Sequence, residues 1–104
     1  MTINKLDIKK IVSNMGLPKK SKYLGYIIHL PVEDEFLGMV HDGDDLELRG
    51  FTKSPEIALK FTSFNEALTE SQKCKGHAEV WLAFDIGSQV ITCPADIVNL
   101  IPSN

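Results

Sequence analysis

Hydrophobic residues near the start of the chain recur with the spacing of an α-helix. The i, i+3, i+4 and i+7 positions of one helix face are taken by Ile8, Ile11, Val12 and Met15. Asn4 can cap the first turn, and Gly16 can end the helix in a left-handed conformation before Pro18. The pattern therefore predicts an amphipathic N-terminal helix over residues 4–15.

Between residues 23 and 51 the pattern changes to the short runs that are typical of β-strands. Tyr23–Leu30 and Phe36–Val40 read as strands, and the loop His41–Asp45 carries Asp-Gly at its centre. In Leu46–Arg49 apolar and charged residues alternate, as in a strand with one wet face. These segments predict an antiparallel β-meander over residues 23–51.

Two helix starts follow each other closely in residues 54–75. Ser54 before Pro55 has the form of an N-cap with proline at the first helical position. Ser63 and Glu66 have the spacing of a capping box, in which each side chain satisfies the backbone N–H of the other residue. A short helical turn and a longer helix are expected, with these apolar residues packed on the sheet and core: Phe51, Ile57, Ala58, Phe61 and Phe64.

Strand spacing returns in residues 79–93, which predict a β-hairpin. In Glu79–Ile86 one face carries Val80, Leu82, Phe84 and Ile86, and the other carries Trp81, Ala83 and Asp85. Gly87-Ser88 suits a two-residue loop before Gln89–Cys93. The tail over residues 94–102 fits either a turn or an extended edge segment. The fold class expected is α+β, an antiparallel sheet of about five strands with the capped helical segment on one face.

Size and composition predict a single domain over residues 1–104. The chain has 104 residues, of which 43% are hydrophobic and 24% charged, as in globular proteins. No apolar run approaches the roughly 20 residues that a membrane-spanning helix needs. The N-terminal segment lacks the apolar stretch of a secretory signal, so a cytoplasmic location without membrane contact is expected.

Charge is unevenly distributed along the chain, although the net charge is only −3. Residues 1–32 carry six lysines against Asp7 alone, a balance of +5, whereas residues 33–48 carry seven acids and no base, a balance of −7. Such asymmetry marks either an interaction surface or a solvated loop. The partner-binding residues expected from it are Glu33, Asp34, Glu35, Asp42, Asp44, Asp45 and Glu47.

Chemistry-bearing residues do not form a recognised catalytic or cofactor motif. Cys74 and His77 have a C-x-x-H spacing, and Cys93 could add a third metal ligand, but no fourth ligand is evident. Cys74 with His77, or Cys93 with His29, could be written as nucleophile–base pairs, but neither lies in a known motif. We therefore expect no enzyme, no metal and no cofactor, with a small Cys/His metal protein or enzyme as an alternative.

The basic residues offer a second alternative, a nucleic-acid-binding accessory protein. A lysine stripe that could meet phosphates consists of Lys9, Lys10, Lys19, Lys20 and Lys22, with Tyr23 or Tyr26 nearby for stacking. A sequence pI of about 5.5 opposes this interpretation, because nucleic-acid-binding domains tend to be basic as a whole. Direct nucleic-acid binding is therefore ranked below protein binding.

A β-meander comes before the segment from Phe51 to Ala67, which contains Ser54-Pro55 and Ser63-x-x-Glu66. In this order of its elements, the chain resembles small phage and prophage accessory proteins. These include anti-CRISPR proteins and other inhibitors of host defence. The resemblance covers residues 23–75 and carries over no functional residue. It implies a phage or mobile-element origin rather than an activity. Together with the acidic segment over residues 33–48, it leads us to expect a non-enzymatic protein in the host cytoplasm that binds and blocks a host defence protein or ribonucleoprotein complex. The acidic loops would lie on a nucleic-acid-binding surface of that complex. A homodimer paired through an edge strand is left open.

Overall fold

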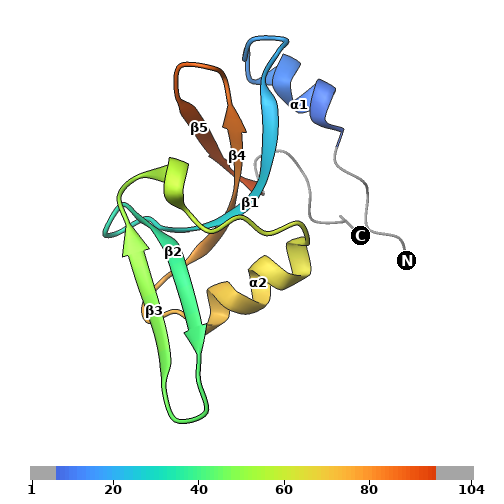
Figure 1. Ribbon diagram of the computed structural model, residues 1–104. Coiled ribbons are helices and arrows are strands. Elements are labelled where there is room, and N and C mark those ends of the chain that lie inside the picture. The colour runs from blue at the N-terminus through green and yellow to red at the C-terminus, as the bar shows by residue number, and fades with distance from the viewer. Residues whose placement is uncertain (1–6, 96–104) are drawn as a thin grey trace, which may run out of the picture.

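The computed structural model describes residues 7–95, which form a five-stranded antiparallel sheet with helices packed on it (Figure 1). The strand order is β3-β2-β1-β4-β5, so the predicted α+β class is confirmed. The elements in chain order are α1 (Ile8–Asn14), β1 (Lys22–Leu30), β2 (Glu35–Asp42), β3 (Glu47–Thr52), the 3-10 turn η1 (Pro55–Ile57), α2 (Phe64–Lys73), β4 (Glu79–Asp85) and β5 (Val90–Pro94).

The N-terminal helix is shorter than predicted and begins at a different cap. The Asp7 side chain accepts a hydrogen bond from the Lys10 N–H at 3.1 Å, which satisfies a free donor of the first turn. Asn4, the expected cap, lies outside the described residues, as does the tail beyond residue 95. Gly16 has a φ of +69° and follows the helix, as its position in the sequence predicts.

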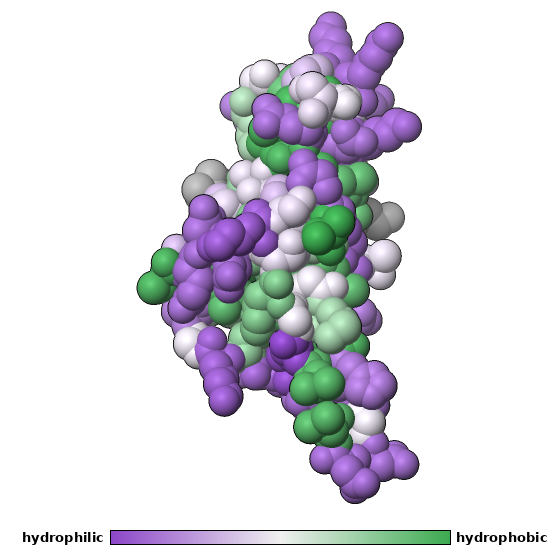
Figure 2. Space-filling view, turned by 60° about the vertical axis from the view of Figure 1, so that its left-hand side comes forward, coloured by the Kyte–Doolittle hydropathy of each residue, from purple (hydrophilic) through white to green (hydrophobic). Residues whose placement is uncertain are grey.

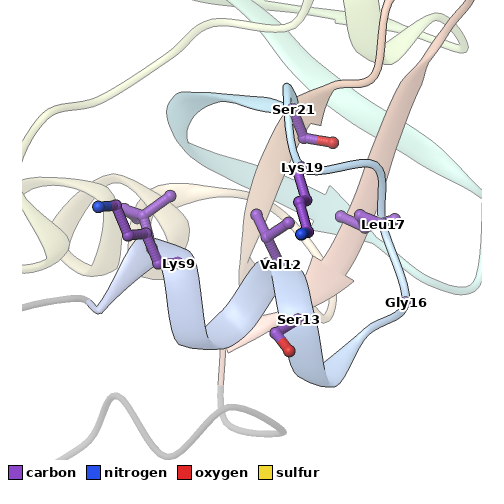
Figure 3. Close-up of a pocket in the computed structure, with 8 residues that line it drawn as sticks. Lys9, Val12, Ser13, Gly16, Leu17, Lys19 and Ser21 are labelled. Carbon is purple, nitrogen blue, oxygen red and sulfur yellow. The ribbon is translucent and has the colours of Figure 1, made fainter.

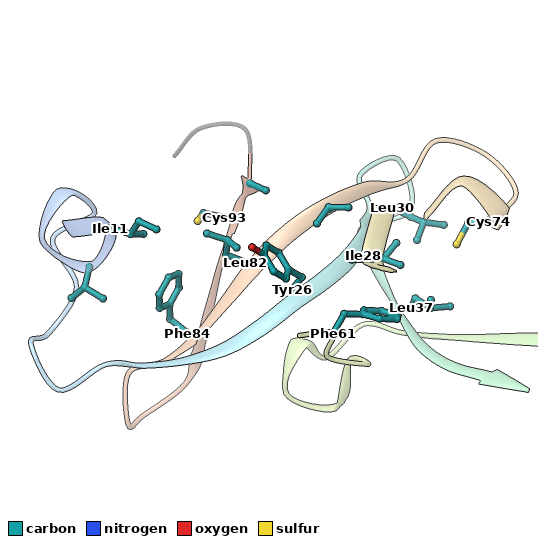
Figure 4. Packing of buried hydrophobic residues seen from close by; sticks show 14 residues of the cluster. Ile11, Tyr26, Ile28, Leu30, Leu37, Phe61, Cys74, Leu82, Phe84 and Cys93 are labelled. Carbon is teal, nitrogen blue, oxygen red and sulfur yellow. The ribbon is translucent and has the colours of Figure 1, made fainter. Parts of the chain in front are cut away.

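Both helices pack on the same face of the sheet, over its larger apolar cluster (Figure 4). From β4 this face receives Val80, Leu82 and Phe84, and the opposite face receives Trp81 and Ala83, so the predicted alternation is confirmed. Ile11 and Val12 of α1 and Ala67 of α2 are buried against this larger cluster. The helices therefore cover one face of the sheet, and the smaller apolar cluster, which includes Ala58, lies on the other face.

The sheet is split between β1 and β2, and a third segment fills the gap. Only His29 and Leu30 of β1 pair with β2, at Phe36 and Glu35. Beyond this point, residues 59–61 lie between the two strands: the Leu59 N–H donates to the Leu37 carbonyl at 2.9 Å, and the Phe61 N–H donates to the Tyr26 carbonyl at 2.8 Å.

The inserted segment also changes sides of the sheet. Ala58 belongs to the smaller cluster, whereas Phe61 belongs to the larger one. Gly25 of β1 makes room for this passage, because a Cβ atom there would lie 2.9 Å from the Phe61 carbonyl oxygen. The β2–β3 hairpin is thereby set apart from the β1–β4–β5 part of the sheet.

The second helical region follows the prediction in outline. The Ser63 hydroxyl accepts from the Glu66 N–H at 3.3 Å and caps α2. Ser54 makes no cap bond to η1, since its hydroxyl donates to the Glu56 carboxylate at 2.6 Å instead. The expectation that Ile57 packs on the sheet is wrong, because this residue is 67% exposed.

Within residues 7–95, no helix is both long enough and apolar enough to cross a membrane.

Candidate interaction surface

The β2–β3 hairpin projects from the body of the molecule and ends in an acidic turn (Figure 1). The turn is closed by a hydrogen bond from the Gly43 N–H to the Leu46 carbonyl, 2.8 Å long. Asp42, Asp44 and Asp45 are exposed at this end. Among residues 7–95, no basic side chain forms an ion pair with any of these three carboxylates. We call these three residues the acidic tip.

Three of the other predicted acids lie at the β1–β2 turn, where two of them have side-chain partners. Asp34, with a φ of +55°, places its carboxylate 3.1 Å from the buried Nε2 of His29. Glu35 lies 3.8 Å from the Lys53 ammonium, which also donates to the Glu33 carbonyl. Of these three acids, only Glu33 has a carboxylate without an ion-pair or hydrogen-bond partner among residues 7–95. These contacts hold the turn together.

The seven predicted acids do not form one continuous surface. The turn group and the acidic tip lie at opposite ends of β2, an eight-residue strand. At about 3.3 Å per residue such a strand separates its ends by roughly 23 Å. Glu47 is also set apart, because it pairs with Arg49, and this contact lowers the pKa of the Glu47 carboxyl.

The apolar side chains of the hairpin are more exposed than the alternation in residues 46–49 suggests. Leu46 is 57% exposed and Leu48 is 45% exposed, whereas the Arg49 side chain is only 12% exposed. The guanidinium is covered because it reaches the Glu70 carboxylate of α2, 3.3 Å away. Figure 2 shows apolar side chains on the hairpin directly above its hydrophilic end. The leucine side of β3 is therefore wet, and sequence alternation alone does not reveal this.

A hollow of about 450 Å³ lies between β3, the β1–β2 turn and the end of α2. Its lining includes Glu33, Glu35 and Glu47 together with Arg49, Lys73 and Lys75, and Phe51 lies among them. Phe51 is 41% exposed, so the expectation that it anchors the helical segment in the core is wrong. Because acids and bases line this hollow together, it favours no ligand of one charge.

The predicted lysine stripe lies at the other end of the molecule, around α1 and the chain that follows it. Lys9, Lys10, Lys19, Lys20 and Lys22 are all exposed. A hollow of about 540 Å³ between α1 and residues 16–21 is lined by Lys9 and Lys19, with Val12 and Leu17 inside it (Figure 3). This surface is accessible to an anion.

The two tyrosines near the lysines are not available to stack on a base. Tyr26 is 8% exposed and packs edge-on against Phe64, with ring centroids 5.7 Å apart. The half-buried Tyr23 ring packs against Tyr26 and Phe84, with centroid distances of 6.1 and 5.5 Å. Desolvation raises the pKa of its buried hydroxyl. The lysine surface therefore offers charge but lacks the aromatic platform that the sequence suggested.

Cys74, His77 and Cys93 do not assemble into a site. Cys74 and Cys93 are buried at well-separated places in the larger apolar cluster (Figure 4), and burial raises the pKa of both thiols. His77 is exposed and bonds Glu79 at 2.9 Å. Within residues 7–95, no three His, Cys, Asp or Glu side chains lie together as a metal site would require.

The second pair considered, Cys93 with His29, is divided by the sheet. The His29 ring packs against Trp81 and Phe36, with centroid distances of 4.2 and 4.9 Å, whereas Cys93 belongs to the larger cluster on the helix side. A thiol and an imidazole on opposite faces cannot exchange a proton directly.

No family model, curated protein or solved structure matches this chain. The resemblance of residues 23–75 to small phage proteins therefore stays a hypothesis from the sequence.

Proposed function

We propose that this protein is a non-enzymatic binding protein that docks its acidic tip on a basic surface of a partner and blocks that surface. The observation that carries the proposal is the exposure of Asp42, Asp44 and Asp45 at the end of a projecting hairpin. Within the described residues these carboxylates have no ion-pair partner. They keep their charge available for a partner's arginines and lysines.

The partner class follows from the charge and from the sequence resemblance. A surface that attracts a compact group of carboxylates is one that normally holds phosphates, so a host nucleic-acid-binding protein or ribonucleoprotein complex is the proposed target. Exposed Leu46 and Leu48 lie next to the acidic tip and can add apolar contact area. The charge then steers the encounter, and the leucines slow dissociation.

The proposal narrows the set of acids that the sequence suggested. Asp34 and Glu35 hold the β1–β2 turn, and Glu47 holds Arg49, so these three act within the chain. Glu33 is exposed but lies at the far end of β2 from the acidic tip. We therefore assign partner binding to Asp42, Asp44 and Asp45.

The test compares two variants that lose the same charge. Asp42, Asp44 and Asp45 are changed to Asn in the first; exposed Glu33, Glu56 and Glu66 are changed to Gln in the control. Proteins captured from nuclease-treated bacterial lysate are identified, and the affinity of the main partner is measured over a salt series. We expect the loss of three exposed charges to weaken binding by at least about tenfold, which corresponds to about 1.4 kcal/mol. The salt dependence should become flatter, because fewer charges remain for salt to screen.

Two results would contradict the proposal. One is equal binding by the tip variant and wild type. The other is a partner that remains able to hold labelled nucleic acid when saturated with this protein, because blocking requires displacement. If capture disappears on nuclease treatment and depends on Lys19, Lys20 and Lys22, the nucleic-acid-binding alternative is supported instead.

A further inference from the structure

Strand β3 forms one edge of the sheet and leaves its outer side unpaired. The strand order places β3 and β5 at the two edges, and within residues 7–95 only β2 pairs with β3. The bond between Gly43 and Leu46 sets the alternation of the hairpin ladder. The Leu46 carbonyl points toward β2, and along a strand the backbone groups of successive residues point alternately toward the paired strand and away from it. The backbone N–H and C=O groups of Glu47, Arg49 and Phe51 therefore point outward, away from β2. They are ready to pair with another strand.

The two edges differ in how they are protected. At β5 the strand ends in Pro94, which has no N–H to donate, and Glu56 lies against the Val90 backbone. Hydrogen bonds lower the pKa of the Glu56 carboxyl: first the bond from the Ser54 hydroxyl, and then bonds from backbone N–H groups, among them that of Val90. From Glu47 to Thr52, by contrast, β3 contains no proline and no lysine, and the register shift opposite it lies on β2. The β3 edge is the open one.

Exposed apolar side chains accompany this open edge. Met39 faces Gly50 across the hairpin and His41 faces Leu48, so alternation places Met39 and Leu48 on the same side. Met39 is 50% exposed, and Leu46, which continues the alternation, is 57% exposed. Figure 2 shows apolar side chains on this part of the hairpin. A partner strand at the β3 edge would cover them.

We propose that two copies of this chain pair through β3, antiparallel, about a two-fold axis at Leu48. In this register Leu48 lies opposite its own copy, and Glu47 of each chain lies opposite Arg49 of the other. Both residues already turn their backbone groups outward, so ladder geometry and charge agree. Opposite charges face each other twice, once on each side of the axis.

Neighbouring registers with the same backbone geometry are worse. An axis at Arg49 places two guanidinium groups opposite each other, and an axis at Glu47 does the same with two carboxylates. Like charges directly opposite destabilise a pair of strands. With the axis at Leu48, Leu46 instead lies opposite Gly50, whose missing side chain leaves Leu46 room beside the Met39 methyl group. The sequence Leu-Glu-Leu-Arg-Gly is thus self-complementary with the axis at Leu48, and not with the axis one residue to either side.

The pairing joins two five-stranded sheets into one continuous sheet and points the two acidic tips in opposite directions. This inference goes beyond the proposed function, since it concerns the protein alone. The pairing is tested by the oligomeric state of Leu48→Lys, whereas the proposed function is tested by partner capture after changes at Asp42, Asp44 and Asp45, so the two proposals can fail separately.

The oligomeric state is measured by sedimentation velocity and by light scattering after size exclusion, over a concentration series. Wild type is expected to form a dimer, and Leu48→Lys is expected to be monomeric at the same concentrations, because two lysines would meet at the axis. The control is Ile57→Lys, a change at a residue that is 67% exposed on η1, which should dimerise like wild type. A monomeric wild type at the highest soluble concentration, or a dimeric Leu48→Lys, overturns the proposal.

A charge exchange tests the register itself. The first variant is Glu47→Lys. The second combines Arg49→Glu with Glu70→Lys, so that its contact between β3 and α2 persists with the two charges exchanged. Each alone should be monomeric, because like charges oppose each other in its own dimer.

Their mixture should form a heterodimer, since the lysine introduced in one chain then meets the glutamate introduced in the β3 strand of the other. The unchanged Arg49 of the first variant likewise meets the unchanged Glu47 of the second. A mixture that stays monomeric while both variants keep the native circular dichroism spectrum overturns this register.

Discussion

The guanidinium of Arg49 lies 3.3 Å from the carboxylate of Glu70, which ties the edge strand β3 to helix α2. These residues are 21 positions apart in the sequence, and both side chains are largely covered, with exposures of 12% and 16%. The contact explains which side of β3 is wet, because it draws the arginine inward and leaves the leucines outside. It also fixes the hairpin that carries the acidic tip.

Arg49→Met is expected to destabilise the protein. The change leaves the Glu70 carboxylate partly buried with one cation fewer beside it, and covered charges without partners are costly. Thermal unfolding followed by circular dichroism measures the effect. The matched control, Lys20→Met, alters an exposed side chain that has no ion pair or hydrogen bond within residues 7–95, and it should unfold close to wild type. Equal losses for the two variants would show that the Arg49–Glu70 contact does not hold the hairpin.

Gly25→Ala is expected to lower the free energy of unfolding by about 3 kcal/mol, through backbone strain and a close contact. Gly25 has a φ of +134°, and its Cβ would lie 2.9 Å from the Phe61 carbonyl oxygen. Gly16→Ala is the control, since Gly16 has a φ of +69° with nothing within 4 Å of the added atom. We expect the control to cost about 1 kcal/mol, from strain alone. Urea unfolding compares the two, and equal costs would argue against a tight passage of residues 59–61.

Glu79→Gln is expected to be destabilising near neutral pH and less so in acid. Hydrogen bonds from Trp81 and then His77 lower the pKa of the Glu79 carboxyl in the folded state below its usual 4.5. The ionised group therefore stabilises the fold above pH 4.5, and this contribution is lost as the pH falls through the lower folded value.

Urea unfolding of wild type and Glu79→Gln at a series of pH values tests this prediction. The stability difference should shrink as the pH falls below 4.5. Glu33→Gln is the control, because the Glu33 side chain has no hydrogen bond within the described residues. A difference that stays constant from neutral to acid pH would mean that Glu79 is not stabilised by these bonds.

Cys74 and Cys93 are expected to resist alkylation in the folded protein. Both thiols are buried, and desolvation raises the pKa of each above its usual 9.0. Mass spectrometry after treatment with iodoacetamide should find both unmodified in buffer and both modified in urea. Rapid modification of either residue in the native protein would indicate an accessible, reactive thiol and would revive the enzyme alternative.

Local signals in the sequence predict most of the secondary structure. The Ser63 cap, the left-handed Gly16 and the alternation of Val80 to Phe84 each act over a few residues, and all three are present in the fold. Caps and periodicity depend on neighbours along the chain, so they can be read before the fold is known. The strand bounds differ from the predicted ones by only a few residues.

The candidate site depends on contacts that the sequence does not contain. The acids of residues 33–47 are close together along the chain, but β2 holds them at opposite ends because a strand is extended. Phe51 and Ile57 have the apolar character of core residues and are nevertheless exposed. Hydrophobicity alone does not say which apolar residues find partners, since a folded surface is always partly apolar.

By itself the sequence determined the α+β class, the Ser63 cap of α2 and the two faces of β4, since these follow from steric preferences and periodicity over short distances. Only the tertiary structure decided that residues 59–61 pass through the sheet, that Arg49 turns inward to Glu70, and that Leu46 and Leu48 remain in water. The reason is physical: each of these outcomes depends on which distant segments meet, and local spacing carries no information about such partners.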